Sequence, residues 1–381
     1  MRESTRERES ARRRKITLFL CGDVMTGRGV DQVLPYPGAP QLHEAYARSA
    51  GDYVDLAERA SGPIPRPAEF AYIWGDALDE LARVDPDLRI INLETAVTRG
   101  DAWEPKGINY RMSPDNIACL TAAGVDCCVL ANNHVLDWGR GGLRETLDTL
   151  ERAGVQVAGA GRDLAAAARP ARLAIGDRWR VWVFGLGAAD SGIPDDWAAA
   201  PRTPGVNLLP TQWDAAVASI ARAVATVKRG QDLAIASIHW GGNWGYDIPP
   251  AQRRLAHDLI DHAAIDIVHG HSSHHPKGIE VHHGKLILYG CGDFINDYEG
   301  IRGHETFRSE LRLMYCATLA ADGALTRLTM TPLRARRFRL QRASGEEARW
   351  LGARLAREGA SLGTTVEVGP DGTLSLRWAT D

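Results

Sequence analysis

The stretch Ile265-Asp-Ile-Val-His-Gly-His-Ser-Ser-His-His-Pro276 joins an apolar run to four histidines within seven positions. Ten of the twelve histidines in this 381-residue chain fall between His239 and His304, where even spacing would place about two. A single histidine on an apolar face is usually a satisfied core residue, but a cluster at the end of a strand is not. Because neutral imidazole is a common metal ligand, the stretch predicts a metal centre. A solvated polar loop is the alternative.

Short apolar runs alternate with amphipathic stretches along the chain, which predicts an α/β fold. The predicted strands are residues 16–21, 88–93, 126–130, 155–158, 180–185, 232–238 and 265–269. The predicted helices are residues 113–124, 143–153, 211–229 and 344–359. Two hairpins are expected near the end, one turning at His283-Gly284 and one joining residues 311–319 to 325–330. Residues 35–67 are rich in proline and glycine and indicate an irregular surface loop.

We divide the chain into a basic disordered tail at 1–15, a main domain at 16–340 and a C-terminal appendage at 341–381.

Composition and charge exclude some classes of protein. The net charge of −3 gives no reason to expect nucleic acid as a partner. No apolar run is long enough to span a membrane. The six cysteines form no Cys-x-x-Cys pair, which favours a cytoplasmic protein and argues against a zinc–thiolate site.

Polar side chains follow several of the predicted strands, at the point where each apolar run ends. These residues are Asp23, Asn92, Glu94, Asn133, His134, His239 and His271. Because the carboxyl ends of parallel strands form one edge of a sheet, we expect them to meet in a single site. For any one of them alone, a turn or cap is the alternative. Oxygen and imidazole ligands without thiolate suit Zn²⁺, Mn²⁺ or Fe, and a carboxylate between two ions could bridge them.

Five motifs occur in a fixed order along the chain: Gly22-Asp-Val-Met, Asn92-Leu-Glu, Leu130-Ala-Asn-Asn-His-Val-Leu-Asp, His239-Trp-Gly and Gly270-His-x-x-His. In this order they resemble the bacterial capsule-synthesis (poly-γ-glutamate, CapA) family of the calcineurin-like metallophosphoesterase superfamily, over residues 16–340. The resemblance implies a metallophosphatase-like four-layer α-β-β-α sandwich. Residues 341–381 would form a small helix-hairpin appendage packed on it.

The resemblance also implies roles for individual residues. The implied metal ligands are Asp23, Glu94, Asn133, His239, His271 and His274. Among them Glu94 would bridge two divalent ions of Mn, Zn or Fe, and His134 would act beside them as a general acid or transition-state stabiliser. The chain departs from the family pattern at Met25, which occupies the position of the first-motif histidine. The first ion, held by Asp23 and His274 besides the bridge, would therefore have one ligand fewer, so that one ion or two could bind.

Four further residues are candidates for substrate binding. Arg111 could grip an anionic group, since arginine binds carboxylate and phosphate bidentately, although a surface ion pair would also explain it. Trp240 could form a wall of the pocket or belong to the aromatic core. Asn92 and His275 lie next to implied ligands in the sequence.

The resulting functional prediction is a metal-dependent hydrolase. A metal-bound hydroxide would attack a phosphoester or a γ-glutamyl or peptide-like substrate, in poly-γ-glutamate or related biosynthesis. The first alternative is a non-catalytic metal-binding component of a capsule-synthesis complex, and the second is a biosynthetic enzyme in which the metal activates a carbonyl. Metal content and turnover of a phosphodiester or γ-glutamyl peptide separate these alternatives. The substrate's identity and the oligomeric state stay open.

Overall fold

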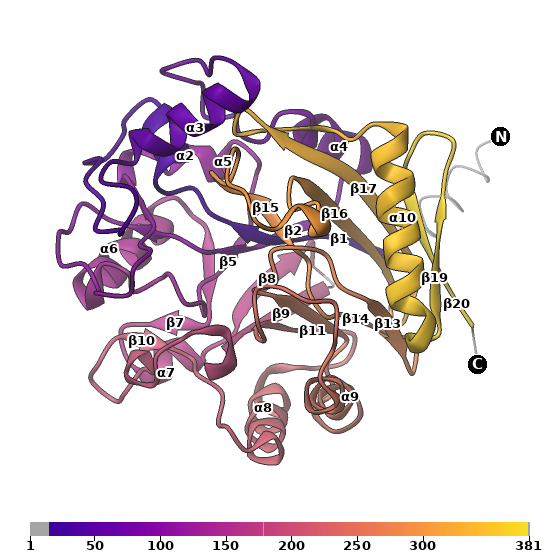
Figure 1. Ribbon diagram of the computed structural model, residues 1–381. Helices are drawn as coiled ribbons and strands as arrows, with labels where there is room; N and C mark the ends of the chain where they lie inside the picture. Colours follow the sequence, from indigo (N-terminus) through magenta and orange to yellow (C-terminus); the bar gives the residue numbers. More distant parts are fainter. Residues whose placement is uncertain (1–14, 178, 380–381) are drawn as a thin grey trace.

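The computed structural model describes residues 15–177 and 179–379, so the predicted tail lies outside the described residues except for Lys15. Two large sheets pack face to face, and helices cover both outer faces (Figure 1). The fold is therefore a four-layer α-β-β-α sandwich, which confirms the predicted class.

The first sheet has ten strands and contains both ends of the described chain. Along the sheet lie β19 (Thr364–Val368), β20 (Leu374–Trp378), β17 (Leu325–Arg336), β16 (Leu311–Ala320), β1 (Lys15–Val24), β2 (Leu88–Leu93), β5 (Cys127–Val129) and β6 (Gln156–Ala158). Two short strands attach at its side, β15 (Asp293–Ile295) to β1 and β18 (Arg339–Arg342) to β17. From β1 to β6 all neighbours are parallel, so these strands end at the same edge.

The second sheet has six strands. In order they are β13 (Ile279–His282), β14 (Lys285–Leu288), β12 (Ile267–His271), β11 (Leu233–His239), β9 (Trp179–Gly187) and β8 (Ala171–Ile175). Here β9, β11, β12 and β14 run parallel, and only the outer strands β8 and β13 are antiparallel. Two-stranded pairs join β10 (Gly205–Val206) to β7 (Ala160–Gly161) and β3 (Ala96–Val97) to β4 (Arg111–Met112).

Strand β1 shows why the two sheets pack together. Its side chains alternate between the two faces, as the period of a strand requires. Leu18 and Leu20 are buried between the sheets, where they join Val183 of β9 and Ile235 of β11 in one core. Phe19 of the same strand belongs instead to the core beneath the outer helices. A strand buried on both faces has a nearly continuous apolar sequence, and residues 16–21 are apolar except for Thr17.

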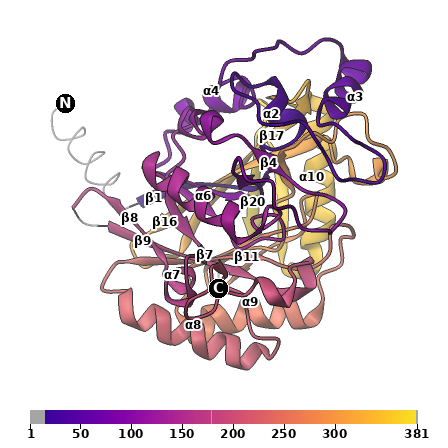
Figure 2. The same cartoon turned by 90° about the vertical axis from the view of Figure 1, so that its left-hand side faces the viewer.

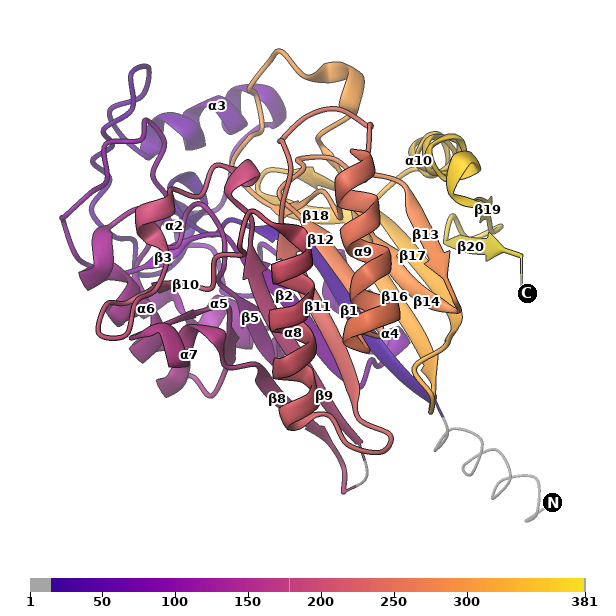
Figure 3. The ribbon, with the colours of Figure 1, turned by 90° about the horizontal axis from the view of Figure 1, so that it is seen from below.

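Helices cover the two outer faces unequally. On the second sheet lie α8 (Trp213–Val227) and α9 (Pro250–Ala263), side by side across its strands (Figure 3). The outer face of the first sheet is covered by a longer set, seen at the top and left of Figure 1. This set comprises α2 (Gly29–Val33), α3 (Gly51–Ser61), α4 (Asp76–Val84), α5 (Ala118–Thr121), α6 (Gly139–Arg152) and, near β7, α7 (Leu164–Ala168). None of the helices in the described residues is long and apolar enough to cross a bilayer.

The structure corrects two local predictions. The expected loop at 35–67 contains helix α3, whose buried face includes Tyr53 and Val54. The expected helix at 113–124 begins as a 3₁₀ turn at Pro114–Asn116 and continues only as the four-residue α5. Proline and the Ser113 cap set the first turn as expected, with Ser113 Oγ accepting from the Asp115 amide at 3.3 Å. Both expected hairpins are confirmed.

The C-terminal segment consists of a helix and two strands, and the two strands extend the first sheet. Helix α10 (Gly345–Gly359) begins at a capping box, in which Ser344 and Glu347 each accept a backbone N–H of the other. Strands β19 and β20 follow, and β20 pairs with β17. Figure 2 shows α10 on the far side of the molecule from the N-terminal end of β1.

Candidate metal centre

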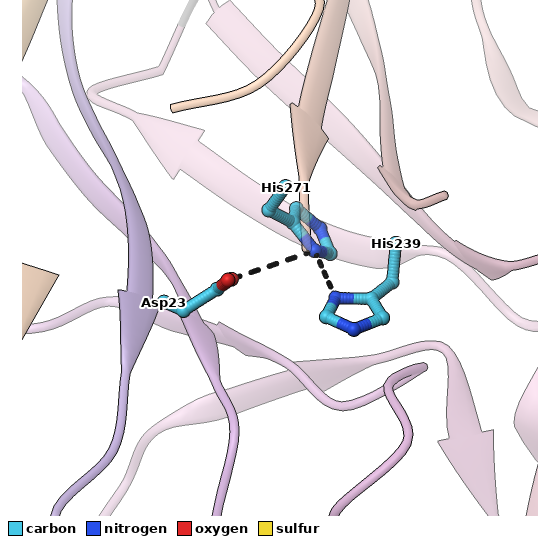
Figure 4. A group of neighbouring side chains, drawn as sticks. All are labelled: Asp23, His239 and His271. Atoms are coloured by element: carbon cyan, nitrogen blue, oxygen red, sulfur yellow. Dashed lines mark hydrogen bonds and ion pairs between the residues drawn. The ribbon is translucent and has the colours of Figure 1, made fainter. Parts of the chain in front are cut away.

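Three parallel strands from both sheets deliver side chains to one buried point. Asp23 lies near the end of β1, His239 ends β11 and His271 ends β12, and all three are buried. The Nδ1 atom of His271 lies 3.9 Å from Asp23 Oδ1 and 2.8 Å from Nδ1 of His239 (Figure 4). The donor atoms of this trio all lie within 4.8 Å of one another. The two sheets thus meet at an assembly of carboxylate and imidazole.

Glu94 occupies the space between this trio and the loop after β5. Its Oε1 lies 3.8 Å from His239 Nε2 and 3.8 Å from His134 Nε2. Asn133 Oδ1 lies 3.1 Å from the same His239 nitrogen. Five of the six implied ligands, together with His134, are therefore linked by direct contacts.

The sixth implied ligand, His274, contacts a carboxylate that the sequence reasoning missed. Strand β15 pairs with β1 so that Asp293 is the register partner of Asp23. The Nδ1–H of His274 donates to Asp293 Oδ1 at 2.8 Å. The donor atoms of Asp23, His274 and Asp293 again lie within 4.8 Å of one another. The signal for Asp293 was present in Gly290-Cys-Gly-Asp-Phe, which belongs to the stretch resembling the family.

The departure at Met25 has a structural counterpart. Its side chain is fully buried, and the hydroxyl of Tyr298 lies 3.8 Å from its sulfur. Tyr298 in turn contacts the ring of His274 edge-on at a centroid distance of 5.4 Å. Met25 therefore brings no imidazole to Asp23 and His274. Asp293 brings them a carboxylate oxygen as a further donor atom.

The charges in the cluster fit a divalent cation. Asp23, Glu94 and Asp293 are at most 2% exposed, and buried charges are tolerated when they are paired or coordinate metals. Burial, together with the neighbouring charge of Asp293, raises the pKa of Asp23 to about 7. Burial, with Asp23 and Asp293 beside it, also holds the pKa of Glu94 well above its usual range. Glu94 Oε2 is buried without a hydrogen-bond partner among the described residues, so it can serve as a metal ligand.

The imidazoles have the protonation state that metal binding needs. Burial lowers the pKa of both His239 and His271 well below the usual value, so the rings are neutral at pH 7. Neutral imidazole and carboxylate are ligands of Zn²⁺, Mn²⁺ and Fe. The residues present therefore fit the implied group.

His134 is held at the edge of the cluster by a carboxylate. Its Nδ1–H donates to Asp137 Oδ2 at 2.6 Å, which leaves Nε2 facing Glu94. Asp137 is fixed by Lys106, whose ammonium lies 2.8 Å from Oδ1, and by the Tyr110 amide at 2.6 Å. Burial lowers the pKa of His134 to about 4, so the ring is neutral at pH 7. Lys106, which also donates to the Asn133 carbonyl, stands in an irregular segment with no sequence signal.

Two amides and one guanidinium orient the buried carboxylates of the cluster. Asn92 Nδ2 donates to Asp23 Oδ1 at 2.7 Å, which places this substrate-binding candidate behind a carboxylate. On the other side, Asn296 Nδ2 donates to Asp293 Oδ2 at 2.7 Å, and Arg312 donates to Asn296 Oδ1 at 2.8 Å. Such partners fix the orientation of ligand side chains.

The other substrate-binding candidates lie apart from these contacts. Arg111 stacks on Trp138 at 3.8 Å and pairs with Asp101, whose side chain is 88% exposed. The Trp240 indole N–H donates to the Tyr289 carbonyl at 2.9 Å within the core beneath α8 and α9. Among the described residues, neither side chain makes a hydrogen bond or an ion pair with the cluster, and only the backbone N–H of Trp240 donates to the His271 carbonyl, at 3.2 Å.

Aromatic side chains flank the His274 side of the cluster. The remaining candidate, His275, is fully buried and stacks on Phe307 at a centroid distance of 4.6 Å. Trp244 lies 5.2 Å from the His274 ring and stacks on His304 at 3.8 Å. A cavity of about 280 Å³ opens next to this group. Its lining includes Trp244, Asn296, Tyr298, His304 and Arg312.

Comparisons with known proteins show what the chain is similar to. Residues 17–298 match the model of a family described as "Bacterial capsule synthesis protein PGA_cap". A "Probable polyglutamine synthesis accessory protein" of Mycobacterium tuberculosis is 50% identical over 365 residues, which cover 95% of this chain and 96% of that one. The "PGA biosynthesis protein CapA" of Bacillus subtilis is 28% identical over 72% of this chain and 62% of its own. A 5'-nucleotidase precursor from Thermus thermophilus aligns with a TM-score of 0.45 at 14% identity, over 84% of this chain and 54% of that one.

Proposed function

Because the chain belongs to the bacterial capsule synthesis protein PGA_cap family, we propose that it is a metal-dependent hydrolase. Its substrate would carry a phosphoester or a γ-glutamyl or peptide-like bond, in the synthesis of poly-γ-glutamate or a related polymer. The membership confirms the resemblance that the ordered motifs gave. The activity itself rests on the site.

One observation carries the proposal: Glu94 is buried, has a free carboxylate oxygen and stands among neutral imidazoles and two further buried carboxylates. The residues that would hold one or two divalent ions are Asp23, Glu94, Asn133, His239, His271, His274 and Asp293. A divalent ion bound there would act as a Lewis acid towards the substrate and would make water a stronger acid. A buried oxygen without a hydrogen-bond partner calls for an explanation, and an ion at this point would supply one.

The protein's own groups would position and transfer protons around the reacting bond. The Nδ1–H of His134 donates to Asp137 at 2.6 Å, so the proton of the neutral ring is on Nδ1. The unprotonated Nε2 therefore faces the cluster. A neutral imidazole so held can accept a proton and then be stabilised as imidazolium by Asp137. Lys106, paired with Asp137 at 2.8 Å, keeps that carboxylate in place. The chain thus offers a proton-transfer residue next to its metal-ligating set.

A non-catalytic role is the second candidate, and two observations favour it. Met25 replaces the first-motif histidine, and the 50% identical mycobacterial relative carries the name of an accessory protein. In this role the centre would stabilise a component of a polymer-synthesis complex without turning over substrate.

Metal analysis with a hydrolysis screen separates the two roles. The full chain is stripped with a chelator, reloaded with Mn²⁺, Zn²⁺ or Fe²⁺, and assayed on bis(p-nitrophenyl) phosphate, p-nitrophenyl phosphate and γ-glutamyl oligomers. Glu94→Gln is the test variant, and Asp214→Asn, whose side chain is 86% exposed, is the matched control. We expect bound metal and turnover in the wild type and the control, and in Glu94→Gln the loss of turnover and of the metal held at this centre. Metal retained by the wild type without turnover of any substrate would favour the accessory role.

A further inference from the structure

A second cluster of histidines lies at the opposite edge of the second sheet from the metal centre. His271 ends β12, whereas His282 and His283 precede β14, which runs parallel to β12. His282 Nε2 lies 3.0 Å from each oxygen of Asp261 in α9, and His283 Nδ1 lies 2.9 Å from Oδ1. All three donor atoms lie within 4.8 Å of one another. Figure 3 shows α9 beside the β13–β14 hairpin that carries the two histidines.

The backbone at His283 has a conformation that few non-glycine residues adopt. The hairpin turns at His283 and Gly284 with φ of 47° and 73°, so both residues occupy the left-handed region. Such two-residue turns favour Asn-Gly or Asp-Gly, and other side chains occupy them at a cost. Here the turn directs the His283 ring to the carboxylate of Asp261. An asparagine at this position would fit the turn but would bring no imidazole nitrogen to that carboxylate.

The second imidazole is fixed by its neighbours. The ring of His282 stacks on His257 at a centroid distance of 3.9 Å and an angle of 3°. His257 Nε2 lies 3.1 Å from Glu280, which also accepts from Arg253 at 2.6 Å and from the Tyr289 hydroxyl at 2.6 Å. Partners of this kind orient a ligand before the ion arrives.

The geometry points to a second metal site, formed by Asp261, His282 and His283, for a borderline divalent transition ion such as Zn²⁺. Two imidazoles and a carboxylate are ligands that Zn²⁺ prefers, and three protein ligands leave a position for water. Ligand distances of about 2.0–2.1 Å in a tetrahedron place neighbouring donors roughly 3.3 Å apart. The observed 2.9–3.0 Å between Asp261 and each imidazole nitrogen therefore needs an outward shift of only a few tenths of an ångström. The two imidazole nitrogens lie within 4.8 Å of one another.

The side chains can make that shift, because the site is open. Asp261 is 27% exposed and His283 is 67% exposed. A bound ion would tie the end of α9 to the β13–β14 hairpin, so it would stabilise the folded protein as a clip between two elements. The site shares no residue with the proposed catalytic centre and does not depend on that centre's activity.

The test counts metal equivalents on the untagged full chain after chelator stripping. Zn²⁺ is added in a calorimetric titration, and Co²⁺ is used in parallel because its visible absorption reports tetrahedral coordination. His283→Asn is the test variant, since asparagine tolerates the left-handed turn. Asp261→Asn is a second variant that leaves the turn sequence intact. His262→Asn is the matched control, because His262 is 69% exposed at the end of the same helix but lies 3.9 Å from Asp258 instead.

We expect His283→Asn and Asp261→Asn each to bind one Zn²⁺ equivalent fewer than the wild type and to lose part of the zinc-dependent rise in Tm. His262→Asn should match the wild type. Glu94→Gln should keep this equivalent, including its tetrahedral Co²⁺ absorption. Equal stoichiometry in the wild type and both test variants would overturn the proposal. So would a wild type whose bound zinc is lost entirely in Glu94→Gln.

Discussion

Asp293 provides a sharp test of the metal centre, because removing its charge should have opposite effects on metal binding and on stability. In Asp293→Asn the side chain keeps its shape, and its amide oxygen can still accept the hydrogen bond from His274. The second oxygen, which accepts the hydrogen bond from Asn296, is replaced by an NH₂ group. Because the acceptor is charged, that hydrogen bond contributes about 1.5–3 kcal/mol. The change also removes like-charge repulsion with Asp23, whose donor atom lies within 4.8 Å. At an effective dielectric constant of about 20, that repulsion between two full charges is about 3.5 kcal/mol or more.

We therefore expect metal affinity to fall at least about tenfold, or ~1.4 kcal/mol. The free energy of unfolding of the stripped protein should stay within about 1 kcal/mol of wild type or increase. Affinity is measured by competition with a chelating indicator, and stability by urea denaturation after chelation. Both are measured in a His283→Asn background, so that the surface histidines do not contribute.

Asp266→Asn is the matched control for this prediction. Asp266 is also buried, but its carboxylate pairs with Lys228 and Lys285 at 2.6 Å each. Removing one partner of a buried pair costs about 3–5 kcal/mol, so this variant should lose stability and keep its metal affinity. If Asp293→Asn behaved like Asp266→Asn, the carboxylate would be a structural ion-pair partner and its assignment to the metal centre would be wrong.

Three further outcomes follow from the site. His134→Ala should keep its metal content, and its turnover should fall by about 10² to 10⁴ on the phosphoester or γ-glutamyl substrate that the wild type hydrolyses. Loss of metal would instead make His134 a ligand. Asp137→Asn should lower turnover with the metal retained, because the ring of His134 loses the acceptor that sets its tautomer; an unchanged pH–rate profile would count against this positioning role. Glu94→Gln should lose more metal than Asp23→Asn in elemental analysis, because Glu94 is the proposed bridge to both ions, and equal or reversed losses would contradict that role.

The sequence predicted those parts of the site that depend on strand ends. The apolar runs are long enough to identify β1, β2, β11 and β12, and polar residues at their carboxyl ends must meet at one edge. Trp240 shows the limit of this reasoning. It follows His239, and successive side chains at a strand end point to opposite faces. His239 therefore faces the cluster, whereas Trp240 enters the core beneath α8 and α9.

Two kinds of residue could not be located from the sequence. Asp293 begins a strand of only three residues, too short to show a period, and its pairing with β1 is a tertiary contact. Lys106 lies in an irregular segment whose path depends on packing. His134 shows a related difficulty. It lies in a turn, where the alternation of a strand does not apply, so Asn133 and His134 both reach the cluster.

The pairing of β1 with β15 and β16 has a consequence for biosynthesis. Asp23 and Asp293 are separated by 293 − 23 = 270 residues, yet they are register partners. At about 5–20 residues per second, the ribosome needs roughly 14 to 54 s to make the intervening chain. During that time β1 lacks the neighbour that β16 later provides, and its apolar edge is a site for chaperones or aggregation. The Asp23–His274–Asp293 part of the centre is therefore completed only after residue 293 has been made, and chains truncated before it would be released without the acidic pair.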